Sequence, residues 1–122
     1  MEKFKVVVAG TRTFHDYKLL RDELDRLLSR KLPDVIIISG GAKGADKIAE
    51  QYAHYHDLEM WVMLADWDKH GRAAGPLRNQ EMAKVADAVV VFWDGVSRGT
   101  MHMIDAARAK KKSLRIIRYT EL

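Results

Sequence analysis

Four short loops in this 122-residue sequence contain most of the residues that could bind an anion. Each loop follows a hydrophobic run and is built of small or polar residues, and three of the four contain glycine. Glycine lets the backbone approach a ligand closely and present N–H groups at the start of a helix. The loops therefore predict a site for an anion, most simply a phosphate; they span residues 10–13, 39–46, 65–68 and 94–100.

Three arginines, Arg12, Arg78 and Arg98, fall in or beside these loops. A guanidinium group donates paired hydrogen bonds to phosphate or carboxylate. Each arginine alone could be a solvated surface residue, and the Gly-Gly-Ala-Lys-Gly turn alone could be a tight connection. Neither G-x-G-x-x-G nor G-x-x-x-x-G-K-[ST] occurs at these loops, which excludes the dinucleotide fingerprint and the P-loop. The three arginines together favour the anion site.

The elements that would position these loops alternate between strand and helix. Five short runs rich in apolar residues read as strands, the first two of them buried, and apolar residues at helical spacing separate them. The strands are expected at residues 4–9, 34–39, 58–63, 87–93 and 114–119, with a longer connection at 64–75. Strands joined by helices form parallel sheets covered on both faces. We therefore predict one doubly wound, Rossmann-like α/β domain over residues 1–122, with a five-stranded, mostly parallel sheet and ligands at the carboxyl ends of its strands.

Composition excludes several classes of protein. The sequence has no cysteine, so disulfides, thiolate zinc sites and cysteine nucleophiles are excluded. Its longest uncharged apolar runs have six residues, whereas a membrane helix needs about 20. The N-terminus lacks the apolar core of a signal peptide. We expect a cytoplasmic protein without a membrane partner.

The formal charge of +4 is local rather than general. Residues 108–118 hold six basic residues and no acidic residue, and the other 111 residues hold 15 basic and 17 acidic residues, a net −2. A lysine run at the end of a predicted helix complements the helix dipole. The basic residues are Arg108, Lys110, Lys111, Lys112, Arg115 and Arg118.

Other chemistries find little support. His54 and His56 do not share a face of the predicted helix, so we expect no metal site made of protein ligands alone, although Mg²⁺ could arrive with the phosphates of a ligand. Ser39 lacks the glycine context of a nucleophile elbow. His70 and His102 have no carboxylate partner in sequence and are expected to be surface residues. Trp67 could equally stack on a nucleobase or anchor the edge of the core.

Four motifs in order, Gly10-Thr11-Arg12, Ser39 to Asp46, Gly75 to Met82, and Gly99-Thr100, resemble the SLOG superfamily. That superfamily groups the Rossmann domain of DNA-processing protein A, the LOG phosphoribohydrolases and the small YspA-like, cpYpsA-related proteins. The sequence is similar to the YspA-like branch over nearly its whole length. The resemblance implies a pocket for a nucleotide or a nucleotide-derived ligand.

The resemblance also implies site residues. The glycine loops would hold phosphate or ribose, and Arg12 and Arg78 would be the cationic partners of the ligand. Asn79 would recognise a polar group of the ligand. Asp46 would bind ribose hydroxyls or brace the glycine loop, with a helix cap as an equal alternative. The complete ligand set is Gly10, Thr11, Arg12, Ser39, Gly40, Gly41, Ala42, Gly44, Asp46, Arg78, Asn79, Gly99 and Thr100. Related domains often complete their pockets across a dimer, so a homo-oligomer is compatible with the resemblance.

Catalysis stays open, and no catalytic residue is assigned. The LOG enzymes carry P-G-G-x-G-T-x-x-E, and the position of that glutamate here is Met103, whose thioether is neither acid nor base. Hydrolysis would need Glu81 or Asp94 from another loop. We therefore expect a nucleotide-binding module, either a sensor or an enzyme of undefined reaction. The alternatives are a module for single-stranded DNA like DNA-processing protein A, which the basic run, Trp67 and Trp93 favour, and a phosphoribohydrolase.

Overall fold

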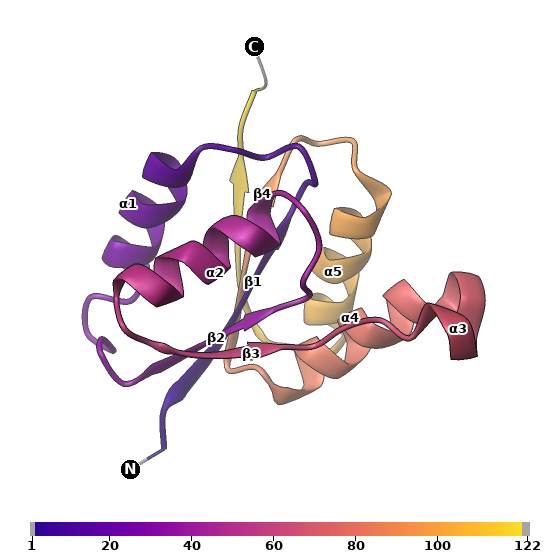
Figure 1. The fold of residues 1–122 in the computed structure, drawn as a ribbon, viewed down its shortest axis with the longest axis horizontal. Helices are drawn as coiled ribbons and strands as arrows, with labels where there is room; N and C mark the ends of the chain where they lie inside the picture. The colour runs from indigo at the N-terminus through magenta and orange to yellow at the C-terminus, as the bar shows by residue number, and fades with distance from the viewer. Residues whose placement is uncertain (1, 121–122) are drawn as a thin grey trace.

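The computed structural model describes residues 2–120, and a five-stranded sheet runs through its centre (Figure 1). The strand order is β3-β2-β1-β4-β5, and every neighbouring pair is parallel. This confirms the predicted Rossmann-like α/β fold, and the sheet is wholly rather than mostly parallel. The strands are β1 Phe4–Gly10, β2 Val35–Ser39, β3 Glu59–Val62, β4 Ala88–Trp93 and β5 Ser113–Arg118.

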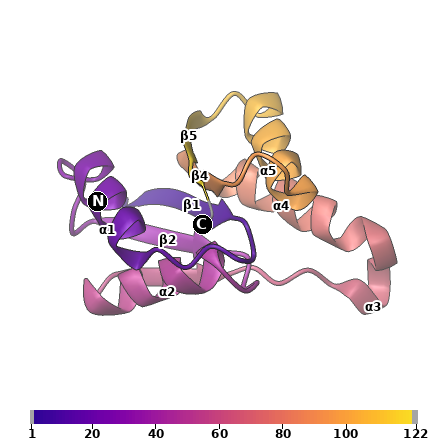
Figure 2. The ribbon, with the colours of Figure 1, turned by 90° about the horizontal axis from the view of Figure 1, so that it is seen from above.

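Helices cover both faces of the sheet, which gives the protein three layers (Figure 2). Helices α1 and α2 pack on one face, while α4 and α5 pack on the other. Successive side chains of β1 point to opposite faces of the sheet, so this strand contributes to both cores. Val6 and Val8 face α1 and α2, whereas Val7 and Ala9 face α4 and α5. The helices are α1 Tyr17–Leu27, α2 Ala45–Tyr55, α3 Trp67–His70, α4 Ala74–Val85 and α5 Arg98–Ala109, with a 3₁₀ turn at Gly71–Ala73.

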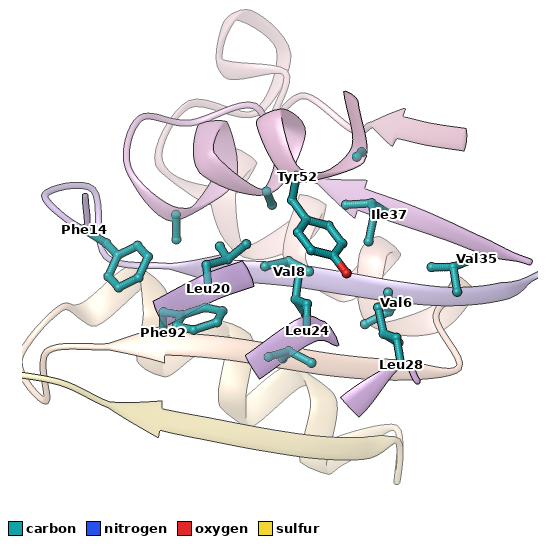
Figure 3. Close-up of a cluster of buried hydrophobic side chains, with 14 residues drawn as sticks. Val6, Val8, Phe14, Leu20, Leu24, Leu28, Val35, Ile37, Tyr52 and Phe92 are labelled. Atoms are coloured by element: carbon teal, nitrogen blue, oxygen red, sulfur yellow. The ribbon is translucent and has the colours of Figure 1, made fainter. Parts of the chain in front are cut away.

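The core under α1 and α2 is closed by leucines and aromatic rings (Figure 3). Leu20 and Leu24 of α1 are fully buried against the sheet. Tyr52 of α2 is also buried, and its hydroxyl donates a 2.7 Å hydrogen bond to the carboxylate of Asp25 on α1. A buried hydroxyl without a partner would destabilise the fold, so this bond lets a tyrosine occupy the core.

The segment 64–75, predicted as a longer connection, contains a short helix. Asp66 caps this helix, α3, by accepting a 3.1 Å hydrogen bond from the backbone N–H of Lys69. The 3₁₀ turn follows, and α4 begins at Ala74, so Pro76 lies in its first turn, where its missing N–H costs no hydrogen bond. A four-residue helix is too short for a hydrophobic period, and the sequence pattern could not reveal it.

The basic run at residues 108–118 forms the end of α5, the turn after it and all of β5. Helix α5 ends at Ala109, and Lys111 turns the chain with a φ of 56°. The prediction that the lysines lie at a helix C-terminus is confirmed. Arg118, at the far end of β5, places its guanidinium 5.2 Å from the centre of the Trp93 ring.

None of the helices within residues 2–120 combines the length and the hydropathy that crossing a membrane requires.

Candidate functional site

A cavity of about 290 Å³ opens at the carboxyl ends of the strands. All strands run in the same direction, so the loops that follow them share one edge of the sheet, and α2, α4 and α5 all begin there. The cavity is lined by Ala9, Gly10, Arg12, Ala42, Asp46, Trp67, Gly75, Pro76, Arg78, Asn79, Met82, Ser97, Arg98, Gly99, Thr100, His102 and Met103.

Eight of the thirteen predicted ligand residues line this cavity, and Arg98 does as well. The three arginines that the sequence placed near the strand ends therefore share one cavity. The eight residues are Gly10, Arg12, Ala42, Asp46, Arg78, Asn79, Gly99 and Thr100. The other five lie outside the lining, and a direct ligand contact by them stays a prediction; they are Thr11, Ser39, Gly40, Gly41 and Gly44.

Ser39 braces the loop that follows β2. Its side chain is fully buried, and its hydroxyl donates to the carboxylate of Glu50 at 2.7 Å. The same oxygen accepts the backbone N–H of Gly41 at 3.0 Å. Both capacities of the hydroxyl are engaged within the protein, so the structure gives Ser39 a role in shaping the loop.

Thr11 has a comparable role in the loop that follows β1. It is buried, and its hydroxyl oxygen accepts a 3.2 Å hydrogen bond from the backbone N–H of Asp94. The first loop is thereby joined to the loop that follows β4.

Gly44 brings the first two loops into contact. Its φ of 78° favours glycine, and a Cβ atom here would lie 2.3 Å from the carbonyl oxygen of Thr11. The next backbone N–H, that of Ala45, donates to the same oxygen at 3.3 Å. A side chain at position 44 would therefore separate the loops that carry Arg12 and Asp46.

Asp46 is buried in the first turn of α2 and faces the glycine loop. Its carboxylate accepts the backbone N–H of Ala42 at 3.1 Å, which confirms that it can brace this loop. Burial raises the pKa of Asp46 from 3.8 to about 6, although the bonds from Ala42 and Gly40 and the charge of Arg78 act against the rise.

Arg78 is a half-buried residue of α4 that lies beside Asp46 and contacts the glycine loop. Its Nη1 atom donates to the carbonyl oxygen of Gly40 at 2.8 Å, and its Nε atom donates to the Oδ1 of Asn79 at 3.0 Å. Burial and the neighbouring Arg12 lower the pKa of Arg78, while Asp46 raises it. Two internal hydrogen bonds fix the guanidinium and leave some of its five N–H groups for a ligand.

The opposite wall is the start of α5. Ser97 caps this helix, and the buried Thr100 hydroxyl donates to the Ser97 hydroxyl at 3.1 Å. Asn79 connects the two walls, since its Nδ2 atom donates to the carbonyl oxygen of Gly99 at 3.5 Å. Asn79 therefore has both polar ends engaged by the protein, although it also lines the cavity.

Sequence reasoning missed several lining residues on helices. Met82 lies one and two turns from Arg78 and Gly75 on α4, and Met103 lies one turn after Gly99 on α5. Residues four or seven apart lie on the same face of a helix. The sequence spacing alone therefore indicated that both methionines would lie near Arg78, Gly75 and Gly99. His102 also lines the cavity while remaining exposed.

The acids proposed as substitutes for the LOG glutamate lie elsewhere. Glu81 is exposed on α4 and does not line the cavity. Asp94 accepts the backbone N–H groups of Val96 and Ser97, which lower its pKa, and it too lies outside the lining. Among the described lining residues Asp46 is the single acid, and Met103 occupies the wall where the resemblance would put the glutamate.

Comparison with known sequences identifies the family. The model of the YspA, cpYpsA-related SLOG family matches residues 4–70, more than half of the chain. The chain belongs to this SLOG family. The match includes the loops after β1, β2 and β3, whereas Arg78 and the α5 loop lie beyond it.

One curated relative and several solved structures are similar to this chain. The Gene 61 protein of Mycobacterium phage D29 is 34% identical over 121 residues, which cover 94% of this chain and 95% of the relative. DNA processing protein A from Streptococcus pneumoniae superposes with a TM-score of 0.78 at 18% identity, covering 98% of this chain and 52% of that chain.

Two further structures share the fold. DNA processing protein A from Helicobacter pylori, described for a unique single-stranded DNA binding mode, has a TM-score of 0.72 at 21% identity and covers 94% of this chain and 65% of that chain. The structural-genomics target TM1055 has a TM-score of 0.66 at 25% identity, with 91% and 72% covered. The present chain thus spans about half to two thirds of the two DNA processing proteins, and the likeness to them shows the fold.

Proposed function

We propose that this SLOG domain binds a phosphate-bearing nucleotide in the cavity at the carboxyl ends of its strands. One observation carries the proposal: Arg12, Arg78 and Arg98, from three separate segments, line the same cavity. The lining holds one acid against these three cations. An anion is therefore the ligand that the charge of the site favours.

Helix termini strengthen the preference for an anion. Helices α2 and α4 both begin at the cavity, and no side chain caps either N-terminus. The positive end of the helix dipole makes such a position favourable for phosphate. The polar arginines and helix termini would hold the phosphate, while Met82, Met103 and Ala9 give the cavity an apolar part.

The family supports nucleotide or nucleic-acid binding at a general level, and the cavity favours a small nucleotide. Its volume of about 290 Å³ lies just below the usual range of ligand pockets, about 300–1,000 Å³. A mononucleotide suits this size better than a dinucleotide.

Mg²⁺ would reach this site with the phosphates of the ligand. Within residues 2–120 no three His, Asp or Glu side chains lie close enough together to hold a metal ion. Asp46, the one acid of the described lining, already accepts the N–H of Ala42. The protein residues therefore fit a divalent cation poorly.

A thermal-shift series tests the proposal. Nucleoside monophosphates at millimolar concentration should raise the melting temperature, and raise it further as their concentration increases. The corresponding nucleosides, which lack the phosphate, should give a much smaller shift. Equal shifts for nucleosides and nucleotides would count against the arginine site.

The second candidate function is binding of single-stranded DNA. The observation that favours it is the exposed basic series Arg108, Lys110, Lys111, Arg115 and Arg118 along α5 and β5. Arg118 and Trp93 pair at the end of β5, and a basic groove with aromatic rings suits single strands. Oligonucleotide binding with a steep salt dependence, lost when Arg115 and Arg118 are replaced by alanine, would establish this function.

A further inference from the structure

The indole ring of Trp67 forms part of the cavity wall without being anchored in the core. Its side chain is 54% exposed, although it lines the cavity. It is the first residue of α3, which projects beyond the carboxyl edge of the sheet in Figure 2. Large aromatic rings usually gain stability by burial, so this exposure calls for another reason.

The three tryptophans differ in how their N–H groups are used. Trp61 donates to the carboxylate of Glu59 at 2.9 Å, and Trp93 donates to the carbonyl oxygen of Ser97 at 3.1 Å. For Trp67, no acceptor lies within hydrogen-bonding distance among the described residues. Trp61 and Trp93 are held by the fold, whereas Trp67 has a free N–H group and a free ring surface.

The backbone beside Trp67 keeps the ring at the cavity. Gly75, in the first turn of α4, has no side chain, and a Cβ atom there would lie 3.4 Å from the Cη2 atom of Trp67. The edge of the ring therefore rests against the start of α4, three residues before Arg78. The cap that Asp66 provides fixes the start of α3 and so fixes the backbone from which the ring extends.

We infer that Trp67 is the stacking surface for an aromatic base, so that the ligand is a nucleotide rather than a sugar phosphate. This inference rests on the proposed phosphate site, since it assumes that the arginines hold the other end of the ligand. An exposed aromatic face beside cationic groups is the combination that binds base and phosphate together. The apolar side chains of Met82 and Met103 line the same cavity and suit an aromatic base as well.

Calorimetric titrations with ribose 5-phosphate and with adenosine 5′-monophosphate test this inference. The wild-type protein should bind the monophosphate at least about tenfold more tightly, the gain expected from one stacked base. Trp67→Leu should lose this gain and bind both compounds with equal affinity. Trp67→Phe should retain most of it, and Leu77→Ala, an exposed apolar residue of α4 outside the lining, should leave it unchanged.

Fluorescence gives an independent measurement. The monophosphate should quench the emission of Trp67, so that Trp67→Phe removes the quenching while Trp61 and Trp93 still emit. Equal affinities in the wild-type protein would overturn the stacking role and leave the phosphate site intact. Loss of ribose 5-phosphate binding in Trp67→Leu would overturn it in favour of a structural role. Failure of the wild-type protein to bind either compound would overturn the phosphate site itself.

Discussion

The guanidinium of Arg78 and the carbonyl oxygen of Gly40 are joined by a 2.8 Å hydrogen bond. Because Arg78 belongs to α4 and Gly40 follows β2, this bond connects a cavity-lining residue to a loop that is 38 residues away in sequence. The contact is close: a Cβ atom on Gly40 would lie 2.5 Å from the Nη1 atom of Arg78. The main cation of the site is therefore held in place before a ligand arrives.

Arg78→Ala should weaken nucleoside monophosphate binding about 10- to 100-fold, the loss of one charge-assisted hydrogen-bonding group. Arg78→Lys should recover part of the affinity, because lysine keeps the positive charge but cannot donate the paired hydrogen bonds of a guanidinium. The exposed Arg72, outside the lining, provides the control Arg72→Ala. Titration calorimetry measures all three. A variant that unfolds, or one with wild-type affinity, would contradict the role of Arg78.

Asp46 should make the protein less stable as the pH rises. Its pKa is about 6 in the folded protein against an ordinary 3.8, so the folded state favours the protonated acid. The stabilisation is complete below pH 3.8 and is lost as the pH rises through about 6, a change of about 3 kcal/mol.

Asp46→Asn removes this titration and keeps an acceptor for the N–H of Ala42. Relative to the wild type, the variant should therefore gain about 2 kcal/mol in unfolding free energy between pH 4 and pH 8, since the wild type has already lost part of the stabilisation at pH 4. Urea denaturation at several pH values measures the difference. Parallel pH profiles for the two proteins would show that Asp46 titrates normally.

Gly44→Ala should destabilise the protein by about 2 kcal/mol or more, because it adds a clash with the carbonyl oxygen of Thr11 to an unfavourable φ. Gly71→Ala is the matched control. Gly71 also has a positive φ, of 54°, but a Cβ atom there meets nothing within 4 Å. The control should cost about 1 kcal/mol from the backbone alone. Equal losses in denaturation experiments would mean that the first two loops are not in close contact.

The wild-type protein should release no free base from nucleoside monophosphates. Met103 offers no proton, and Glu81 and Asp94 lie outside the lining. Prolonged incubation followed by chromatography for free adenine or guanine tests this expectation. Base release that Asp46→Asn abolishes would instead make the domain a phosphoribohydrolase with Asp46 as its acid.

Much of the fold could be predicted from the sequence because the three central strands, β1, β2 and β4, are buried on both faces. Val35 to Ile38 are all buried, so β2 is a continuous apolar run rather than an alternating one. The strand-end loops and the convergence of Arg12, Arg78 and Arg98 followed from the parallel topology. Gly44 could be placed in a loop, whereas its contact with Thr11 depends on how two loops approach in space.

The parts that could not be predicted depend on tertiary packing. From the sequence, the Ser39 hydroxyl was expected to contact a ligand. In the structure it donates its hydrogen bond to the carboxylate of Glu50 on α2 instead. Trp67 sits on a helix of four residues, which leaves no periodic signal. His102 was expected at the surface, and it is both exposed and part of the lining, since the start of α5 forms a wall.

Calorimetric titration of the wild-type protein with nucleoside monophosphates, in parallel with a single-stranded oligonucleotide, tests the central claim most directly. The account predicts saturable binding of the monophosphates, strongly reduced in Arg78→Ala and unchanged in Arg72→Ala. The absence of binding to every monophosphate, together with oligonucleotide affinity that falls steeply with salt, would contradict it.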